Sequence, residues 1–220
     1  MKPANDPAIN YRDLVRLGYE RCADAYAVAR EEGESGLPAL LDRLAPGSEV
    51  LDIGCGAGVP VTASLAEHHR VTGIDLSSRM IELARARLPA GRFLLADVLE
   101  AEFEAESFDA AVAMYMLFHV PRERQREVFR RVHAWLKLGG RFLVSVSEND
   151  EAGYTEDDFF GVTMYWSNYD LGAYLEMLDA SGFNVDEVHY VGEGYADADS
   201  RAQTRHPVVL ASKVREERAA

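Results

Sequence analysis

The stretch Glu49-Val-Leu-Asp-Ile-Gly-Cys-Gly-Ala-Gly-Val-Pro60 decides the fold. The mostly apolar run over residues 50–53 predicts a short buried strand. Glycines at every second position from Gly54 to Gly58 then allow a tight turn and let a ligand lie against bare backbone. Pro60 suits the first turn of a helix, where a missing N–H costs nothing. A strand, a glycine loop and a helix in this order predict the opening of a nucleotide-binding βαβ unit.

Two aspartates accompany the glycine loop and narrow the class of ligand. Asp52 lies inside the predicted strand, two residues before the loop, where its carboxylate could orient the loop and reach an ammonium group. Asp75 ends a second predicted strand over residues 71–75, 21 residues after Gly54, where an acid can hold a ribose diol. Dinucleotide enzymes use the pattern G-x-G-x-x-G here, but in this chain a single residue separates the second and third glycines. The spacing therefore disfavours a nicotinamide oxidoreductase.

This combination resembles the first motifs of the class I S-adenosylmethionine-dependent methyltransferases. Motif I of that family is similar to residues 50–58, and its ribose-binding acid corresponds to Asp75. The resemblance covers roughly residues 11–213. It implies an α/β fold, a doubly wound, seven-stranded Rossmann-like sheet in the order 3-2-1-4-5-7-6 with the last strand antiparallel, and S-adenosylmethionine as the cofactor. The alternative is another α/β protein in which the loop only packs a helix against the sheet.

The resemblance also implies where the cofactor binds. At the end of the third predicted strand, Asp97 would accept a hydrogen bond from the exocyclic amine of adenine, or it would simply begin the next turn. Tyr19 and Tyr26 lie seven residues apart on one helix face, and would cover the cofactor or only anchor that helix to the core. The predicted cofactor-binding residues are Tyr19, Tyr26, Asp52, Gly54, Cys55, Gly56, Asp75, Leu76, Met80, Asp97, Val98 and Met114.

Strands and helices alternate along the rest of the chain, as in a doubly wound domain. We expect helices over residues 11–30, 37–44, 59–69, 79–88, 122–136 and 169–180, and strands over residues 92–97, 108–115, 141–147, 183–191 and 207–211. Ser77 or Ser78 would cap the helix at 79–88, and residues 137–140 would form a turn before the fifth strand. Ser167 or Asn168 would cap the last helix, with Asp170 completing a capping box.

Length and composition indicate a single globular domain over residues 1–220, with an N-terminal helical cap over about 10–45. The 220 residues suffice for a sizeable core, and 48% of them are hydrophobic. No apolar run approaches the roughly 20 residues that span a bilayer, and the N-terminus lacks the apolar core of a signal peptide. We therefore expect a cytoplasmic protein with no membrane partner, as a monomer or homodimer.

The net charge of −14 opposes binding to nucleic acid, because a field of this sign repels phosphate. It would tolerate a cationic cofactor such as a sulfonium. The two cysteines, Cys22 and Cys55, lie far apart without CxxC spacing, so neither a disulfide framework nor a thiolate zinc site is indicated. No catalytic metal is expected, because Tyr115 and Met116 stand where metal-dependent catechol-type enzymes need an acidic ligand.

The carboxyl ends of the parallel strands form the expected active-site edge. His119, just after the fourth predicted strand, and Tyr115, at its end, are the candidate catalytic residues. Methyl transfer from a sulfonium is an in-line displacement in which alignment and desolvation supply most of the rate. A general base is needed only for acceptors that arrive protonated, and His119 could supply it or could only support its loop.

Residues 148–168 exceed a usual strand–helix connection and are rich in aromatic side chains. This insertion predicts a lid and an acceptor pocket, although a satellite core under a long loop is also open. If the last strand is antiparallel, residues 192–206 reach the same edge of the sheet. The predicted substrate-pocket residues are Tyr154, Phe160, Tyr165, Trp166, Tyr195 and His206.

The expected function is methyl transfer to an oxygen or nitrogen atom of a small molecule. The N/D-P-P-Y/F motif of amino and adenine-base methyltransferases is missing from residues 109–118, and two cysteines are too few for arsenite methylation. A non-catalytic S-adenosylmethionine-binding protein is the main alternative, because fold and cofactor motif do not guarantee turnover. A nicotinamide oxidoreductase is the alternative from another class of enzyme.

Overall fold

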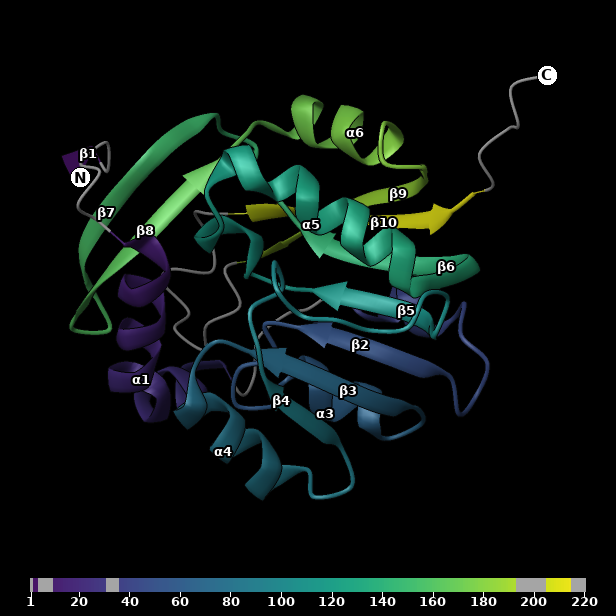
Figure 1. The fold of residues 1–220 in the computed structure, drawn as a ribbon, viewed down its shortest axis with the longest axis horizontal. Coiled ribbons are helices and arrows are strands. Elements are labelled where there is room, and N and C mark those ends of the chain that lie inside the picture. The colour runs from purple at the N-terminus through teal and green to yellow at the C-terminus, as the bar shows by residue number, and fades with distance from the viewer. Residues whose placement is uncertain (1, 4–9, 31–35, 193–204, 215–220) are drawn as a thin grey trace.

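A seven-stranded sheet forms the centre of the molecule (Figure 1). The computed structural model describes residues 2–3, 10–30, 36–192 and 205–214. Strand β10 runs antiparallel to both of its neighbours, whereas the other pairings in this sheet are parallel. The spatial order is β4-β3-β2-β5-β6-β10-β9, which is 3-2-1-4-5-7-6 when only these strands are numbered, so the predicted topology is confirmed. The strands are β2 (Glu49–Ile53), β3 (Arg70–Asp75), β4 (Arg92–Leu95), β5 (Phe108–Ala113), β6 (Leu136–Ser145), β9 (Phe183–Gly192) and β10 (Arg205–Lys213).

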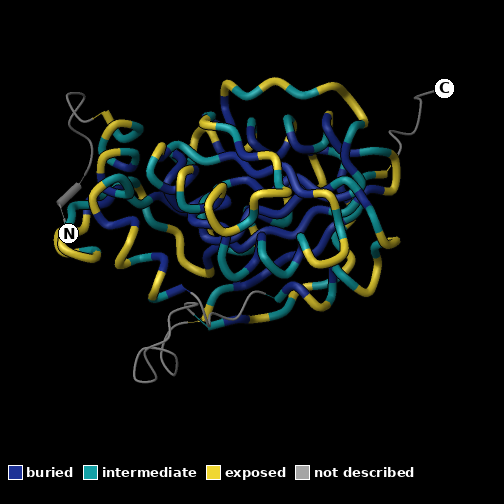
Figure 2. The backbone as a smooth tube through the Cα atoms, turned by 90° about the horizontal axis from the view of Figure 1, so that it is seen from below, coloured by how far each residue is buried: buried dark blue, intermediate teal, exposed yellow. Residues whose placement is uncertain are grey.

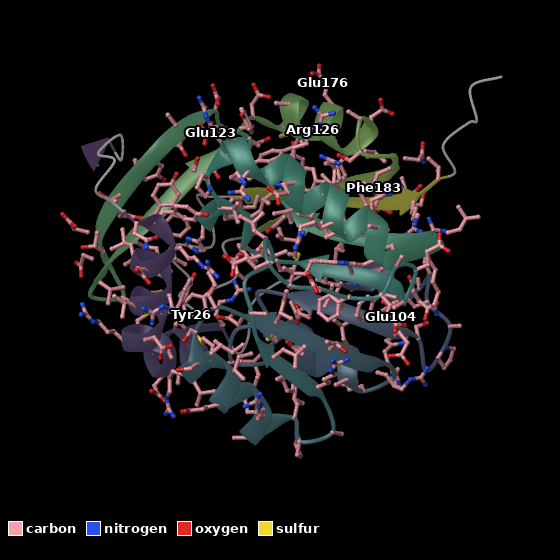
Figure 3. The ribbon with its side chains drawn as sticks, viewed as in Figure 1. Tyr26, Glu104, Glu123, Arg126, Glu176 and Phe183 are labelled. Carbon is pink, nitrogen blue, oxygen red and sulfur yellow. The ribbon has the colours of Figure 1, made fainter. Side chains whose placement is uncertain are left out.

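Helices cover both faces of this sheet, which is why its central strands are nearly continuous apolar runs. Leu51 joins the core cluster on the side of α5 and α6, whereas the adjacent Val50 joins the cluster on the side of α2 and α3. The buried parts of the chain gather in the interior of the molecule (Figure 2). Charged residues of α5 and α6, among them Glu123, Arg126 and Glu176, lie on the outside (Figure 3).

The helices lie close to their predicted positions, as α1 (Tyr11–Arg30), α2 (Pro38–Leu41), α3 (Val61–Ala66), α4 (Ser78–Arg87), α5 (Arg122–Trp135) and α6 (Leu171–Asp179). Ser77 caps α4, since its hydroxyl oxygen accepts a hydrogen bond from the backbone N–H of Met80. The predicted cap of α6 at Ser167 or Asn168 is wrong. Asp170 caps α6 by accepting from the N–H of Ala173 at 2.8 Å, because residues 167 and 168 belong to a strand.

The predicted turn at residues 137–140 is a bulge inside β6. Phe108 of β5 pairs with Leu136, whereas Ala110 pairs with Arg141, so residues 137–140 stand opposite a single residue of β5. Gly139 has φ +75°, a left-handed conformation that glycine adopts at no steric cost. The strand therefore begins earlier than expected, directly at the end of α5.

Residues 148–168 contain a β-hairpin that the sequence did not indicate. Strands β7 (Glu151–Phe159) and β8 (Val162–Asn168) pair antiparallel, and β7 also pairs with the short β1 (Lys2–Pro3) in a second sheet. Phe160 and Gly161, with φ +50° and +77°, turn the hairpin. In Figure 1 this hairpin stands beside α1, at one end of the central sheet.

A close contact holds α1 against the hairpin. A Cβ added to Gly18 would lie 2.9 Å from Cε of Met164 and 3.5 Å from the carbonyl oxygen of Thr163, so glycine permits this approach. Val15 packs with Met164 and Tyr165 in a small core of its own. The part of the chain that the structure describes contains no helix long and apolar enough to cross a membrane.

Candidate active site

The glycine loop after β2 shapes a site at the carboxyl edge of the sheet. Gly54, Gly56 and Gly58 have φ of +73°, +52° and +83°, so a side chain would strain the backbone at each of them. A Cβ on Gly54 would lie 2.5 Å from Cβ of Met116, which shows how closely the next loop approaches. At Gly56 an added Cβ would meet nothing within 4 Å. The loop therefore leaves open space against its backbone at Gly56.

Asp75 fastens the glycine loop to the end of β3. Its Oδ2 accepts from the backbone N–H of Gly56 at 3.0 Å, and its Oδ1 accepts from that of Ser77 at 2.8 Å. Burial raises the pKa of Asp75 to about 6, although these two hydrogen bonds act in the opposite direction. Each carboxylate oxygen has a second lone pair, so Asp75 can still accept from two hydroxyl groups of a ligand.

Asp52 lies inside β2 and is 2% exposed. Its Oδ2 accepts a hydrogen bond from the hydroxyl of Thr62 at 2.6 Å. Burial and the nearby charge of Asp75 raise the pKa of Asp52 to about 7. A cation bound beside Asp52 would offset this burial and favour the ionised form.

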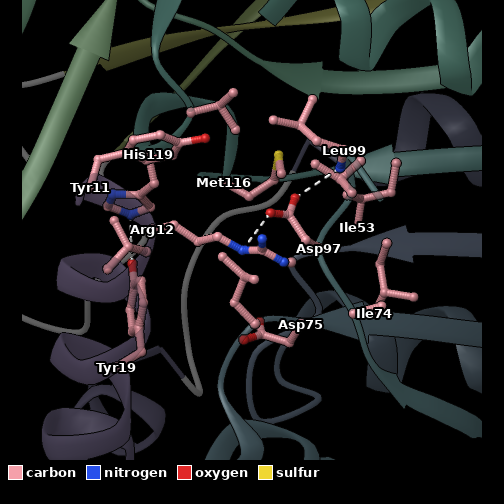
Figure 4. Close-up of a pocket in the computed structure, with 16 residues that line it drawn as sticks. Tyr11, Arg12, Tyr19, Ile53, Ile74, Asp75, Asp97, Leu99, Met116 and His119 are labelled. Carbon is pink, nitrogen blue, oxygen red and sulfur yellow. Dashed lines mark hydrogen bonds and ion pairs between the residues drawn. The ribbon is translucent and has the colours of Figure 1, made fainter. Parts of the chain in front are cut away.

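A narrow cavity of about 70 Å³ lies between α1 and the ends of β2, β3 and β4 (Figure 4). Asp97 is 8% exposed within it, and its Oδ1 accepts from the backbone N–H of Leu99 at 2.8 Å. Its Oδ2 lies 2.9 Å from Nε of Arg12, an ion pair that Figure 4 shows as a dashed line. The same guanidinium bonds both carboxylate oxygens of Glu100, at 2.5 and 2.6 Å. The predicted adenine-binding carboxylate is thus held by a cation from α1.

A smaller hollow continues from the glycine loop toward Arg30 at the end of α1. Arg30 is 5% exposed, and its guanidinium carbon lies 4.3 Å from the centroid of the Tyr115 ring. Asp52, Cys55 and Met114 line the same hollow. The carboxyl group of Asp52 and the guanidinium of Arg30 thus line one hollow beside the glycine loop, as a ligand with an ammonium and a carboxylate group requires.

His119 is hydrogen-bonded at both ring nitrogens. Nδ1 lies 2.8 Å from the carbonyl oxygen of Tyr165, which can only accept, so Nδ1 carries the proton. Nε2 then accepts from the hydroxyl of Tyr19, also at 2.8 Å. Burial lowers the pKa of His119 to about 4, and the ring lies 4.5 Å from that of Trp166. His119 is therefore neutral at pH 7 and positions the hydroxyl of Tyr19.

A second, larger cavity of about 510 Å³ lies under the hairpin. Tyr19 and Tyr26 line it from α1, with ring centroids 5.2 Å apart, and Phe159 contacts both rings. Tyr19 also lines the narrow cavity, and Tyr26 also lines the hollow at Arg30. The two tyrosines thus stand at the junction of all three spaces. The other residues that line the large cavity are Tyr115, Phe118, Ser147, Glu148, Asn149, Glu151, Tyr154, Glu156, Trp166, Asn168, Arg205 and His206.

The remaining predicted site residues are divided between cavity walls and the core. Leu76 and Val98 line the narrow cavity, whereas Met80 is buried against Ala23 and Ala27 of α1 and lines none of the three spaces. Of the predicted pocket residues, Tyr154, Trp166 and His206 line the large cavity, and Phe160 and Tyr165 do not. Tyr195 lies outside the described residues. Tyr115 lines the large cavity, but its hydroxyl donates to the carbonyl oxygen of Gly192 at 2.5 Å.

Arg12 and Arg30, which line the narrow cavity and the hollow, were not among the residues predicted from the sequence. Their spacing of 18 residues is five helical turns, which places both on one side of α1 together with Tyr19 and Tyr26. This shared side of the helix was the feature of the sequence that pointed to the two arginines. Within the described residues there is no group of three or more His, Cys, Asp or Glu side chains that could hold a metal ion.

Comparison with known proteins agrees with this geometry. The family described as Methyltransferase domain matches residues 50–140. Phosphoethanolamine N-methyltransferase 3 of Arabidopsis thaliana is 33% identical over 153 residues, which is 66% of this chain and 30% of that protein. The chain spans between 29% and 39% of the length of the first three curated relatives it matches.

Solved structures share the fold over nearly the whole chain. The 1,6-didemethyltoxoflavin-N1-methyltransferase of Burkholderia thailandensis, solved with bound 1,6-didemethyltoxoflavin and S-adenosylhomocysteine, has a TM-score of 0.73 at 24% identity, and the match covers 97% of this chain and 94% of that one. The [4+2]-cyclase SpnF has a TM-score of 0.69 at 20% identity, with coverage of 96% and 99%. Residues 50–140 thus match a methyltransferase domain, and the sheet order and the solved structures give the whole chain the fold of the class I S-adenosylmethionine-dependent methyltransferases, a class whose cofactor is S-adenosylmethionine.

Proposed function

We propose that this chain transfers a methyl group from S-adenosylmethionine to a nitrogen or oxygen atom of a small molecule. The observation that carries the proposal is the position of Tyr19 and Tyr26 between the two spaces at the glycine loop and the large cavity under the hairpin. This arrangement suits one ligand against the glycine loop and a second ligand in the large cavity. The helical cap at about 10–45 and the hairpin lid at about 148–168 would close over the two ligands.

The residues at the glycine loop fit S-adenosylmethionine group by group. Asp75 would accept from the ribose hydroxyls, and Asp97 and Val98 would contact the adenine. Asp52 would face the ammonium group, and the buried guanidinium of Arg30 would face the carboxylate. Bound there, the cofactor supplies an electrophilic methyl group on a positively charged sulfur.

The chain's own contribution to the reaction is alignment and exclusion of water. His119 accepts from the Tyr19 hydroxyl through Nε2 and so fixes the orientation of that hydroxyl where the narrow and the large cavity meet. A histidine with a pKa of about 4 is a weak base near neutral pH, so we assign His119 a positioning role. Tyr115 would line the acceptor site rather than take part in proton transfer.

The acidic character of the chain supports a small-molecule acceptor rather than nucleic acid. A non-catalytic cofactor-binding protein is the second candidate, because a shared fold does not guarantee methyl transfer, and the [4+2]-cyclase SpnF has this fold too. The cytoplasmic location, the monomeric or dimeric state and the absence of a catalytic metal stay predictions.

Calorimetric titration with S-adenosylhomocysteine and, separately, with NAD tests the cofactor class. We expect micromolar binding of the first ligand only, and at least tenfold weaker binding in Asp75→Ala, because the ribose contacts are lost. Asp179→Ala, at an exposed position at the end of α6, is the matched control and should bind as the unmodified protein does. Binding of NAD instead would support the oxidoreductase, and binding of neither ligand would contradict the proposal.

A further inference from the structure

The walls of the large cavity carry an excess of negative charge. Among the residues that the structure describes, Glu148, Glu151 and Glu156 line it, against one arginine, Arg205. Arg205 is already engaged, since Nη2 donates to the carbonyl oxygen of Tyr190 at 3.1 Å and the guanidinium lies 5.6 Å from that ring's centroid. An anionic ligand would meet three carboxylates and a single guanidinium that already bonds a backbone carbonyl. The cavity therefore favours a neutral or cationic ligand.

Aromatic side chains also line the same cavity. Tyr19, Tyr26, Phe159 and Trp166 line it where it meets the cofactor site, and Phe159 lies 5.3 to 6.1 Å from the other three rings. Rings in such a cluster attract a cation through their negative faces and exclude water from it. Carboxylates and aromatic rings that line one cavity are the two features that bind a substituted ammonium group.

A buried acceptor atom gives independent support for a ligand with a donor group. Asn168 lines the cavity and is 6% exposed. Its Nδ2 donates to Oε2 of Glu151 at 3.1 Å, but within the described residues its Oδ1 is buried without a hydrogen-bond partner. Leaving such an oxygen unsatisfied costs about 1–3 kcal/mol, so a ligand N–H or O–H that meets it when the Asn168 side chain turns toward the cavity would be favoured.

We propose that the methyl acceptor is an amine that enters the large cavity as a cation, held by Glu151 and Asn168 and flanked by Tyr19, Tyr26 and Trp166. This inference rests on the proposed function and narrows its acceptor from nitrogen or oxygen to an amine nitrogen. An aromatic or aliphatic body on the amine would fill the rest of the 510 Å³. The glutamates that line the large cavity thus recognise the acceptor, whereas the glycine loop recognises the cofactor.

The reaction balances without a further reactant. The protonated amine first releases its proton to bulk water by way of an exposed glutamate that lines the cavity, Glu148 or Glu156. The nitrogen lone pair then forms the N–CH₃ bond while the bond from that methyl carbon to sulfur breaks, and its electron pair stays on sulfur. The products are a methylated ammonium ion and S-adenosylhomocysteine.

A pair of isosteric probes tests the charge preference. We would titrate 2-phenylethylamine and 2-phenylethanol into protein saturated with S-adenosylhomocysteine at pH 7.5. We expect the amine to bind at least tenfold more tightly than the alcohol, with an advantage that shrinks as sodium chloride is raised. The proposal is overturned if the amine binds no more tightly than the alcohol, whether both bind equally or neither binds.

Variants separate this inference from the cofactor assignment. Glu151→Gln should lower the amine affinity at least tenfold and leave the alcohol affinity and the S-adenosylhomocysteine affinity unchanged. Glu102→Gln, on an exposed loop outside the cavity, is the control and should change none of the three. Unchanged amine binding in Glu151→Gln would overturn the amine proposal alone. Failure of the unmodified protein to bind S-adenosylhomocysteine would instead refute the proposed function.

Discussion

At the scale of single residues, the buried carboxylate of Asp52 lowers the stability of the folded protein. The same carboxylate would serve ligand binding. Its pKa of about 7 in the folded protein lies above the ordinary aspartate value of about 3.9. The folded state therefore holds the proton more tightly than the unfolded state. As the pH rises from about 4 through 7, the buried carboxylate ionises at a free-energy cost, and the protein loses stability.

Asp52→Asn removes that cost and keeps an oxygen that can accept from Thr62. We expect the gain in unfolding free energy to be larger at pH 8 than at pH 5, by on the order of 2 kcal/mol, since each pKa unit corresponds to about 1.4 kcal/mol. Urea denaturation at the two pH values measures it. The same variant should bind S-adenosylhomocysteine at least tenfold more weakly. Equal stability gains at both pH values would contradict the burial argument.

His119 offers a second test at this scale, because its two hydrogen bonds can be partly reproduced. His119→Gln keeps an amide N–H for the carbonyl of Tyr165 and an amide oxygen for the hydroxyl of Tyr19, whereas His119→Ala keeps neither. We expect kcat of the glutamine variant to stay within about tenfold of the unmodified enzyme, and that of the alanine variant to fall further. Thermal melts confirm that both variants fold. An equal loss of 10²–10⁴-fold in both would indicate base catalysis instead.

The site residues that the sequence could predict are those that a local motif fixes. Asp52 and Asp75 follow from their distances to the glycines, because strand and loop determine their positions. The helical spacing of Arg12 and Arg30 places them on the face of Tyr19 and Tyr26, but α1 carries other arginines as well, and only its docking decides which of them face the cofactor site. Met80 shows the reverse, since the motif implied cofactor contact and the structure places it in the core beneath α1.

At the scale of elements, α1 is attached to the N-terminus of α4. One carboxylate oxygen of Glu20 accepts from the N–H and the hydroxyl of Ser78, at 2.7 and 3.0 Å, and the other accepts from the N–H of Arg79 at 3.3 Å. The backbone donors at a helix start lack partners within the helix, and the helix dipole favours a negative charge there. Glu20 thus caps α4 from another helix.

We expect Glu20→Ala to lower the unfolding free energy by about 1–2 kcal/mol, the usual range for losing a helix cap. It should also speed the dissociation of S-adenosylhomocysteine, because α1 lines the cofactor site. Arg21→Ala, at the neighbouring exposed position of the same helix, controls for the general effect of a substitution in α1. Stopped-flow dissociation rates measure the effect, and equal rates in Glu20→Ala and Arg21→Ala would contradict it.

The elements of the central sheet could be predicted, whereas the hairpin could not. Burial on both faces makes strands such as β5 apolar along their length, which is a strong signal. Strand β7 has a run of acidic residues and a glycine, both disfavoured in strands, and its pairing with β8 depends on contacts with α1. The aromatic content of residues 148–168 therefore indicated a lid without indicating its secondary structure.

At the scale of the whole molecule, the net charge of −14 should distinguish the cofactor from its product. S-adenosylmethionine carries a sulfonium and S-adenosylhomocysteine a neutral sulfur, so their net charges differ by one although their shapes nearly coincide. The field of the protein attracts the former, and salt screens that field over about 10 Å at 0.1 M ionic strength. Between 20 and 300 mM sodium chloride, we expect the affinity for S-adenosylmethionine to fall roughly two- to fivefold and that for S-adenosylhomocysteine to change less than twofold. Parallel titrations of both ligands measure this, and equal salt slopes would mean that contacts at the site, rather than the charge of the whole chain, decide which of the two is held.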